Sequence, residues 1–206
     1  MPESGSIDLT RHFLIAMPGL VDGLFTRSVI YICEHGEDGA MGLIVNKTSD
    51  LSLTDLFEKI ELPLRRPDLT GQPVYQGGPV RPDRGFVLHS PMRPSPGKAT
   101  AVPTDGIGES AYASTLHIPD GLDMTTSRDV LEALSLGAGP SQVLVTLGYS
   151  AWGQGQLESE IAENAWITVA ADASVVFDTP VAERYDRALS LLGLSAWMLA
   201  PEAGRA

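Results

Sequence analysis

The sequence predicts a single α+β domain, and three observations lead to this prediction. A length of 206 residues suits one domain, which can bury roughly 70% of the surface that the unfolded chain exposes. A hydrophobic content of 43% beside 19% charged residues is ordinary for a globular protein. Strand-like and helix-like apolar patterns alternate along the chain, and no repeat, low-complexity stretch or change of composition marks a linker.

The first 45 residues contain three apolar runs with the pattern of strands, at 12–17, 28–34 and 40–45. The run at 28–34 is apolar on both faces, so we expect it to lie centrally in a sheet. The segment 35–39 supplies turn residues that tolerate positive φ, which predicts a hairpin with the run that follows.

Four segments have the apolar stripe of an amphipathic helix: 52–60, 127–136, 154–163 and 179–193. Ser52 and Asp55 have the spacing of a capping box, and Pro180 suits a first helical turn. A glycine-rich turn is expected before the third helix. Further strands are expected at 73–77, 85–89, 99–102, 113–118, 142–148, 166–170 and 174–177. Seven prolines between positions 67 and 96 favour loops and edge strands in that region.

Cysteine content and the N-terminus indicate a soluble cytoplasmic protein. The single cysteine, Cys33, excludes an intramolecular disulfide. The first eight residues are acidic and polar, without the basic and apolar regions of a signal peptide. No apolar run approaches the ~18 residues that a membrane-spanning helix needs, so no membrane association is expected.

The charge distribution is uneven. The net charge of −12 opposes binding to a phosphate backbone, so direct nucleic acid binding is not expected. The segment 65–98 nevertheless has six basic and two acidic residues, whereas 99–206 has four basic and 14 acidic residues. We interpret the basic segment as a solvated, arginine-rich loop, and a patch for an anion or an acidic partner is the alternative.

Several catalytic signatures are absent from the sequence. It contains no phosphate-binding loop, no dinucleotide fingerprint and no paired-histidine zinc motif, and its four histidines stand far apart. We therefore expect no metal and no cofactor. An enzyme assembled from scattered residues remains open, but a binding or regulatory role is favoured over catalysis.

Cys33 and His35 form the first candidate site, at the end of a predicted central strand. Strand alternation places both side chains on one face, where an imidazole would favour the reactive thiolate. His89, which ends another apolar strand, is a third candidate member. The competing interpretation is a buried cysteine that packs as a small apolar side chain, with His35 belonging to the turn.

A second candidate site lies between a strong strand and the third predicted helix. The order of residues resembles a nucleophile elbow, but Trp152 replaces its final glycine, so a nucleophilic Ser150 is not expected. Backbone amides at the helix start around Gly153, Gln154 and Gly155 are candidates for binding an anion. Trp152, Gly153 and Gln156 are the candidate ligand-binding residues of this segment. Two glutamates in the first turns, Glu158 and Glu160, argue against this because they complement the helix dipole themselves.

A third candidate site combines paired glycines with nearby arginines. Gly77 and Gly78 permit close approach of the backbone, and Arg81 and Arg84 have the chemistry to bind a phosphate or carboxylate. A tight turn between two strands explains the glycines equally well.

Short motifs along the chain together resemble one bacterial family. They are HFLIAMP at 12–18, FTRSV at 25–29, CEH at 33–35, GAMGL at 39–43, NK at 46–47, GGP at 77–79, RGFVLHS at 84–90, GY at 148–149, Trp152, GQLE at 155–158 and NAW at 164–166. Each motif is weak alone, whereas their ordered combination is highly specific. The chain thus resembles the AlgH/YqgE family of uncharacterised proteins over roughly residues 10–192.

The resemblance implies an α+β fold with a large mixed, curved β-sheet and packed helices. It implies one domain at 10–195, between a flexible N-terminus at 1–9 and a C-terminal tail at 196–206. The family also carries the label of a transcriptional regulator, from an association with alginate production, although the sequence shows no helix-turn-helix.

Three hypotheses of function follow. The first is a cytosolic regulatory protein that binds another protein. The alternative is an enzyme or redox sensor centred on Cys33 and His35. The third, direct DNA binding, would have to use the basic segment 65–98.

Overall fold

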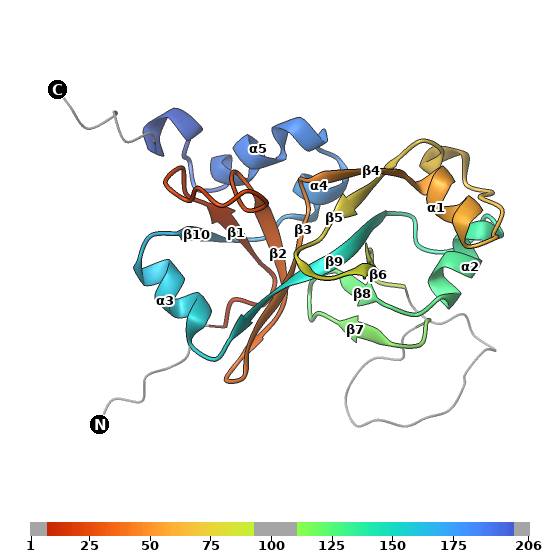
Figure 1. Cartoon of the computed structure of the whole chain (residues 1–206), viewed down its shortest axis with the longest axis horizontal. Helices are drawn as coiled ribbons and strands as arrows, with labels where there is room; N and C mark the ends of the chain where they lie inside the picture. Colours follow the sequence, from red (N-terminus) through yellow and green to blue (C-terminus); the bar gives the residue numbers. More distant parts are fainter. Residues whose placement is uncertain (1–7, 93–110, 200–206) are drawn as a thin grey trace.

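The computed structural model describes residues 8–92 and 111–199. Within these ranges a curved sheet of ten strands packs against five α-helices (Figure 1). One strand pair is parallel and the others are antiparallel, so the sheet is mixed. The predicted fold class, α+β with a large mixed, curved sheet and packed helices, is confirmed. No helix in the described ranges is long and apolar enough to span a bilayer.

The strands, in chain order, are β1 His12–Ala16, β2 Val29–Gly36, β3 Gly39–Ile44, β4 Thr48–Ser52, β5 Pro73–Gln76, β6 Val80–His89, β7 Thr115–His117, β8 Asp123–Thr125, β9 Val143–Gly153 and β10 Trp166–Ala170. The helices are α1 Leu53–Lys59, α2 Asp129–Ser135, α3 Gln156–Ala162, α4 Ala173–Phe177 and α5 Arg184–Ser190. Short 3₁₀ turns occur at Pro67–Leu69, Val181–Glu183 and Ala196–Leu199. At the start of α1, Ser52 and Asp55 make both hydrogen bonds of the predicted capping box.

Strand β9 joins the two halves of the sheet. Its last residues pair with β3, whereas its first part pairs with β5 and β6. Gly148, with φ of 72°, lies where the strand changes partners. A Cβ at this position would lie 2.4 Å from the carbonyl oxygen of Gly78, so only glycine fits. The strand order is β10-β1-β2-β3-β9-β6-β8-β7, with β5 also on β9 and β4 on β5.

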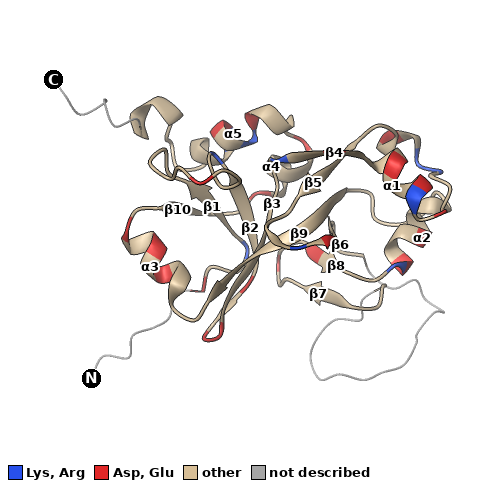
Figure 2. Cartoon of the chain, in the orientation of Figure 1, with Lys and Arg blue, Asp and Glu red and all other residues tan. Residues whose placement is uncertain are grey.

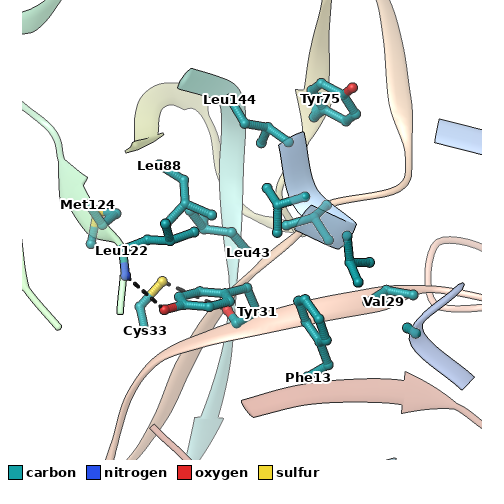
Figure 3. Packing of buried hydrophobic residues seen from close by; sticks show 14 of the residues in the cluster. Phe13, Val29, Tyr31, Cys33, Leu43, Tyr75, Leu88, Leu122, Met124 and Leu144 are labelled. Carbon is teal, nitrogen blue, oxygen red and sulfur yellow. Dashed lines mark hydrogen bonds between the residues drawn. The ribbon is translucent and has the colours of Figure 1, made fainter. Parts of the chain in front are cut away.

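Three clusters of buried apolar side chains form the core. The central cluster lies among β1–β3, β6, β9 and helices α4 and α5, and Figure 3 shows Tyr31, Cys33 and Leu144 within it. The α3 cluster covers the opposite face of β1–β3, and a third cluster lies beneath α1 and α2. Because successive residues of β2 enter the central and α3 clusters alternately, the predicted two-sided burial of 28–34 is confirmed.

Two predicted local structures are wrong. Residues 174–177 form helix α4 rather than a strand, because Asp172 caps the helix by accepting the Ser174 amide and Val175 and Val176 are buried. Here burial and capping outweigh the preference of valine for strands. The glycine-rich turn expected before α3 is shorter than predicted, because β9 continues to Gly153 and pairs there with β3.

The sequence pattern does not predict two of the strands, β4 and β8. β4 is polar, and β8 has only three residues, so neither shows a strand period. The strand expected at 99–102 lies outside the described residues. The domain limits at residues 10 and 195 stay a prediction. Just outside these limits, Leu9 is buried and Ala196–Leu199 form a 3₁₀ turn.

Candidate functional site

Cys33 and His35 lie on opposite faces of β2, so the expectation that they share one face is wrong. The pairing with β3 shifts between Ile32 and Glu34, which leaves Cys33 as the extra residue of a β-bulge and reverses the alternation beyond it. The Cys33 side chain points into the central cluster, with its sulfur 3.8 Å from the carbonyl oxygen of Tyr31 (Figure 3). Burial raises the pKa of this thiol, so we expect Cys33 to be a poor nucleophile in the folded protein.

The His35 side chain is held by hydrogen bonds on both ring nitrogens. Its Nδ1 accepts the Leu9 amide at 3.1 Å, and its Nε2 lies 2.8 Å from a carboxylate oxygen of Glu158. An accepting Nδ1 requires the proton on Nε2, so Nε2 donates to Glu158. Only 3% of the side chain is exposed. His35 therefore ties the segment before β1 and helix α3 to the end of β2.

His89 belongs to a separate polar group at the β6–β8 pair. Its Nδ1 donates to the Ser90 carbonyl at 2.9 Å, and Nε2 accepts from the Thr125 hydroxyl at 2.9 Å. Thr115 extends the chain, 2.7 Å from the Thr125 oxygen. Burial lowers the pKa of His89, which agrees with a neutral ring. Its neighbour Leu88 enters the central cluster with Cys33, so alternation turns His89 away from that cysteine.

Trp152 is part of a clamp built on one carboxylate. One oxygen of Glu160 accepts the indole N–H of Trp152 at 2.9 Å and that of Trp166 at 2.7 Å. The other oxygen accepts from the Gln156 side chain at 2.9 Å, and Gln156 in turn accepts the Gly153 amide at 3.0 Å. The backbone amide proposed for an anion is thus bound by the chain's own side chain. The clamp fastens α3 to β9 and β10.

Gly77 and Gly78 are buried against β9. A Cβ on Gly77 would lie 2.2 Å from the Gly148 oxygen, and one on Gly78 would lie 2.2 Å from the Tyr149 carbonyl carbon. The paired glycines therefore allow two backbones to cross closely. Arg81 and Arg84 are exposed, and Arg84 reaches Thr126 at 3.4 Å. The structure does not gather the glycines and arginines into one ligand site.

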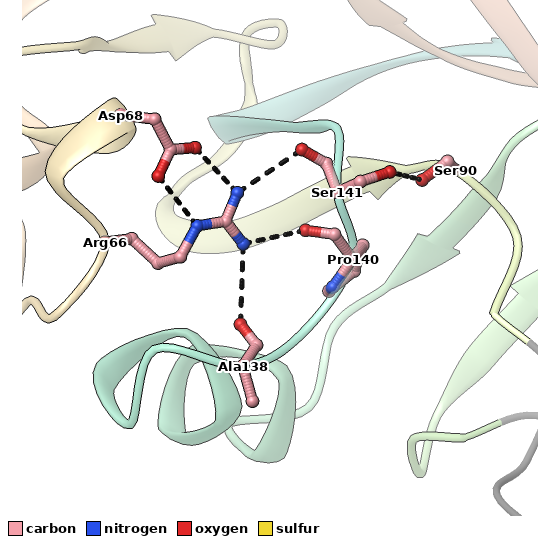
Figure 4. A network of polar contacts seen from close by, with 6 residues as sticks. All are labelled: Arg66, Asp68, Ser90, Ala138, Pro140 and Ser141. Carbon is pink, nitrogen blue, oxygen red and sulfur yellow. Dashed lines mark hydrogen bonds and ion pairs between the residues drawn. The ribbon is translucent and has the colours of Figure 1, made fainter.

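Within the basic segment, Arg66 serves an internal function. Its guanidinium pairs with both carboxylate oxygens of Asp68 and donates to the carbonyl oxygens of Ala138, Pro140 and Ser141 (Figure 4). These bonds join the loop before β5 to the loop before β9. Arg93 and Lys98, two further basic residues of the segment 65–98, lie outside the described residues.

A cavity of about 180 Å³ lies between β5, the start of β9 and the α4–α5 connection. Buried Arg184 lines it beside Tyr75, whose ring centroid is 5.1 Å from the guanidinium carbon. Arg184 Nε donates to the Thr179 carbonyl at 3.0 Å, and Nη1 donates to the Val45 carbonyl. Burial lowers the pKa of Arg184, although the neighbouring Tyr75 opposes that change.

Sequence reasoning missed Arg184 and the clamp role of Glu160. The available signal for Arg184 was its position four residues before the buried Ala188, on the apolar stripe of the last predicted helix. A charged residue at position 184 is either buried with the apolar side chains of that helix or interrupts their row. No sequence signal pointed to Glu160, because its two indole partners come from different strands.

The apolar side chains that remain exposed are unevenly distributed. Within the described residues the large exposed ones are Val21, Leu136, Leu192, Trp197 and Met198. Three of these five fall within seven positions at the end of the described chain. Across residues 8–92 and 111–199, no three His, Cys, Asp or Glu side chains are grouped to hold a metal ion.

Comparison with known proteins gives a consistent result. A family model described as AlgH-like matches residues 13–197. A UPF0301 protein of Paracidovorax citrulli is 65% identical over 210 residues, covering 99% of each chain. One from Verminephrobacter eiseniae is 68% identical over 203 residues, covering 98% of each.

Two solved structures resemble this one. The solution structure of AlgH from Pseudomonas aeruginosa is 42% identical and matches over 100% of each chain with a TM-score of 0.71. A crystal structure of a Corynebacterium diphtheriae protein is 21% identical and covers 89% of this chain and 87% of that one, with a TM-score of 0.65. The second likeness shows the fold alone.

Proposed function

The chain belongs to the AlgH-like family, and from this premise we propose that it is a cytosolic regulatory protein that acts by binding another protein. The supporting observation is a group of exposed apolar side chains close together in sequence, Leu192, Trp197 and Met198, here called the C-terminal apolar surface. Trp197 is 68% exposed, and tryptophan is among the residues most enriched at the energetic centres of protein interfaces. Such a residue on the surface has no packing role in the described chain to explain it.

The residues around the C-terminal apolar surface are anchored to the core. Its neighbours Leu191, Leu194, Ala196 and Leu199 pack against the central cluster. The backbone that carries Trp197 is therefore anchored, so binding a partner would require little ordering of this segment.

The chemistry of the partner is inferred from the charge on α5, the helix that precedes this surface in the chain. Helix α5 and the turn before it carry Glu183, Asp186 and Arg187, which line an open hollow of about 450 Å³ together with Asp178. Acidic residues on α5 are visible in Figure 2. We assign the surface to a protein segment with an apolar anchor flanked by lysine or arginine side chains, because complementary charge steers such a segment to the acidic side of the site.

A photo-crosslinking experiment tests this proposal. A photoreactive amino acid is placed at position 197 in the source cells, and a matched control is placed at Leu136, which is 69% exposed and far from α5 in sequence. We expect position 197 alone to crosslink to one protein, through a peptide that contains basic and apolar residues. Identical crosslinks from both positions would contradict the proposal.

Purified components give the quantitative test. Trp197→Ser should weaken binding of the crosslinked partner by at least about 30-fold, the size of an interface hot spot. Leu136→Ser should leave the affinity unchanged, and added salt should weaken the wild-type complex. Equal affinities of the two variants, or binding that is insensitive to salt, would contradict the assigned partner chemistry.

A further inference from the structure

Arg184 carries a buried charge without a carboxylate partner in the part of the chain that the structure describes. The residue is only 6% exposed, yet no Asp or Glu of the described residues lies within ion-pair distance of its guanidinium. Arg66 offers an internal comparison, because it also donates to backbone carbonyls but adds a carboxylate, Asp68, at 2.6 Å. Among residues 8–92 and 111–199, a counter-ion thus lies beside the more exposed arginine and none beside the buried one.

In the described residues, Arg184 interacts with backbone carbonyl groups and with an aromatic ring. Two backbone carbonyls and the Tyr75 ring stabilise its charge in part. A buried charge without a counter-ion is costly, because hydration is lost and no opposite charge replaces it. An anion that entered the adjacent cavity would remove this cost, which is a driving force for binding that a surface arginine lacks.

The cavity has the size and lining for a small organic ligand. A closed apolar cavity of ~150 Å³ accepts benzene, so about 180 Å³, in a pocket that also opens to solvent, accommodates one aromatic ring of that size. The wall is mixed, and its apolar part includes Leu53, Leu69, Val176 and Phe177. Gln72 and Gln142 also line the cavity and add polar groups to its wall.

We propose that this cavity binds a small organic monocarboxylate, whose carboxylate pairs with Arg184 and whose short apolar body contacts the walls. A planar carboxylate matches the fork of a guanidinium. A dianion is disfavoured because the exposed Asp178 also lines the cavity and would repel a second negative charge. The cavity shares Asp178 with the hollow on α5, but its assigned ligand and its tests do not depend on the partner-binding proposal.

Thermal unfolding of the full chain with benzoate as the probe tests the proposal. With half-saturation near ~1 mM, 10 mM benzoate should raise the melting temperature by about 3–6 °C in a chain of this size. Benzamide, which has the same shape without the charge, should have no effect, and inorganic phosphate should have little. A flat response to benzoate, or an equal response to benzamide or phosphate, would overturn the assigned ligand class.

Two variants locate the effect. Arg184→Met should abolish the response to benzoate, but it also removes the two bonds that hold the α4–α5 connection. Val143→Phe keeps Arg184 and adds volume at the cavity wall, so the folded variant, checked by circular dichroism, should show a reduced response. Retention of the wild-type shift by the folded Val143→Phe protein would show that Arg184 is only a structural clamp.

Discussion

The clamp on Glu160 offers a sharp test of how α3 is fastened to the sheet. Glu160→Ala removes the oxygen that accepts both indole N–H groups, while Trp152 and Trp166 are 6% and 4% exposed. The two rings lie edge to face with centroids 6.1 Å apart, so they cannot both turn their N–H groups to solvent without repacking. The substitution leaves the two buried indole N–H groups without the carboxylate oxygen that accepts from them.

The magnitude follows from the two lost hydrogen bonds. A hydrogen bond to a charged acceptor contributes about 1.5–3 kcal/mol, and the two bonds share one oxygen, so they do not add in full. Glu160 is itself half-buried, which lets water replace part of the loss. We therefore expect Glu160→Ala to lower the free energy of unfolding by about 2–4 kcal/mol, and the melting temperature by roughly 4–16 °C.

Urea unfolding followed by circular dichroism measures the loss. Glu163→Ala is the matched control, because this exposed glutamate ends the same helix and accepts only from Ser159 at 3.3 Å. It should change stability by less than about 0.5 kcal/mol. If Glu160→Ala were as stable as the control, the indole bonds would not hold α3, and apolar packing of Leu157 would have to account for its position.

Three further outcomes are expected. Gly78→Ala should destabilise the fold by about 3 kcal/mol or more, because the added Cβ would lie 2.2 Å from Tyr149. A Cβ at Gly85 meets no atom within 4 Å, so Gly85→Ala should be tolerated. Similar urea midpoints for the two variants would contradict this prediction. The Cys33 thiol should react with a thiol reagent no faster than the protein unfolds, because burial raises its pKa and shields it; rapid labelling of the native protein would refute this. His89 has a lowered pKa when folded, so its contribution to stability is complete above pH 6.5, the unfolded value, and is lost as pH falls toward the folded value. His89→Gln should therefore flatten the stability curve below that pH, and an unchanged slope in urea titrations would count against a buried neutral ring.

Local patterns predicted much of the fold but less of the site. The run at 28–34 revealed a strand buried on both faces, and the Ser52–Asp55 spacing revealed the start of α1, because both signals depend only on neighbours in sequence. The pairing of Cys33 with His35 failed because it assumed unbroken alternation. A bulge depends on the partner strand, so one strand's sequence does not show it.

The sequence by itself determined the apolar periods, the helix caps, the glycines and the family motifs of this protein. Only the tertiary structure decided what those residues contact. It placed Trp152, Trp166 and Glu160 together from two strands and a helix, and it set Arg184 beside Tyr75 across 109 positions. The physical reason is that propensity and capping act over a few residues, whereas burial of a charge or a shared hydrogen-bond acceptor depends on which distant segments the packed core brings together.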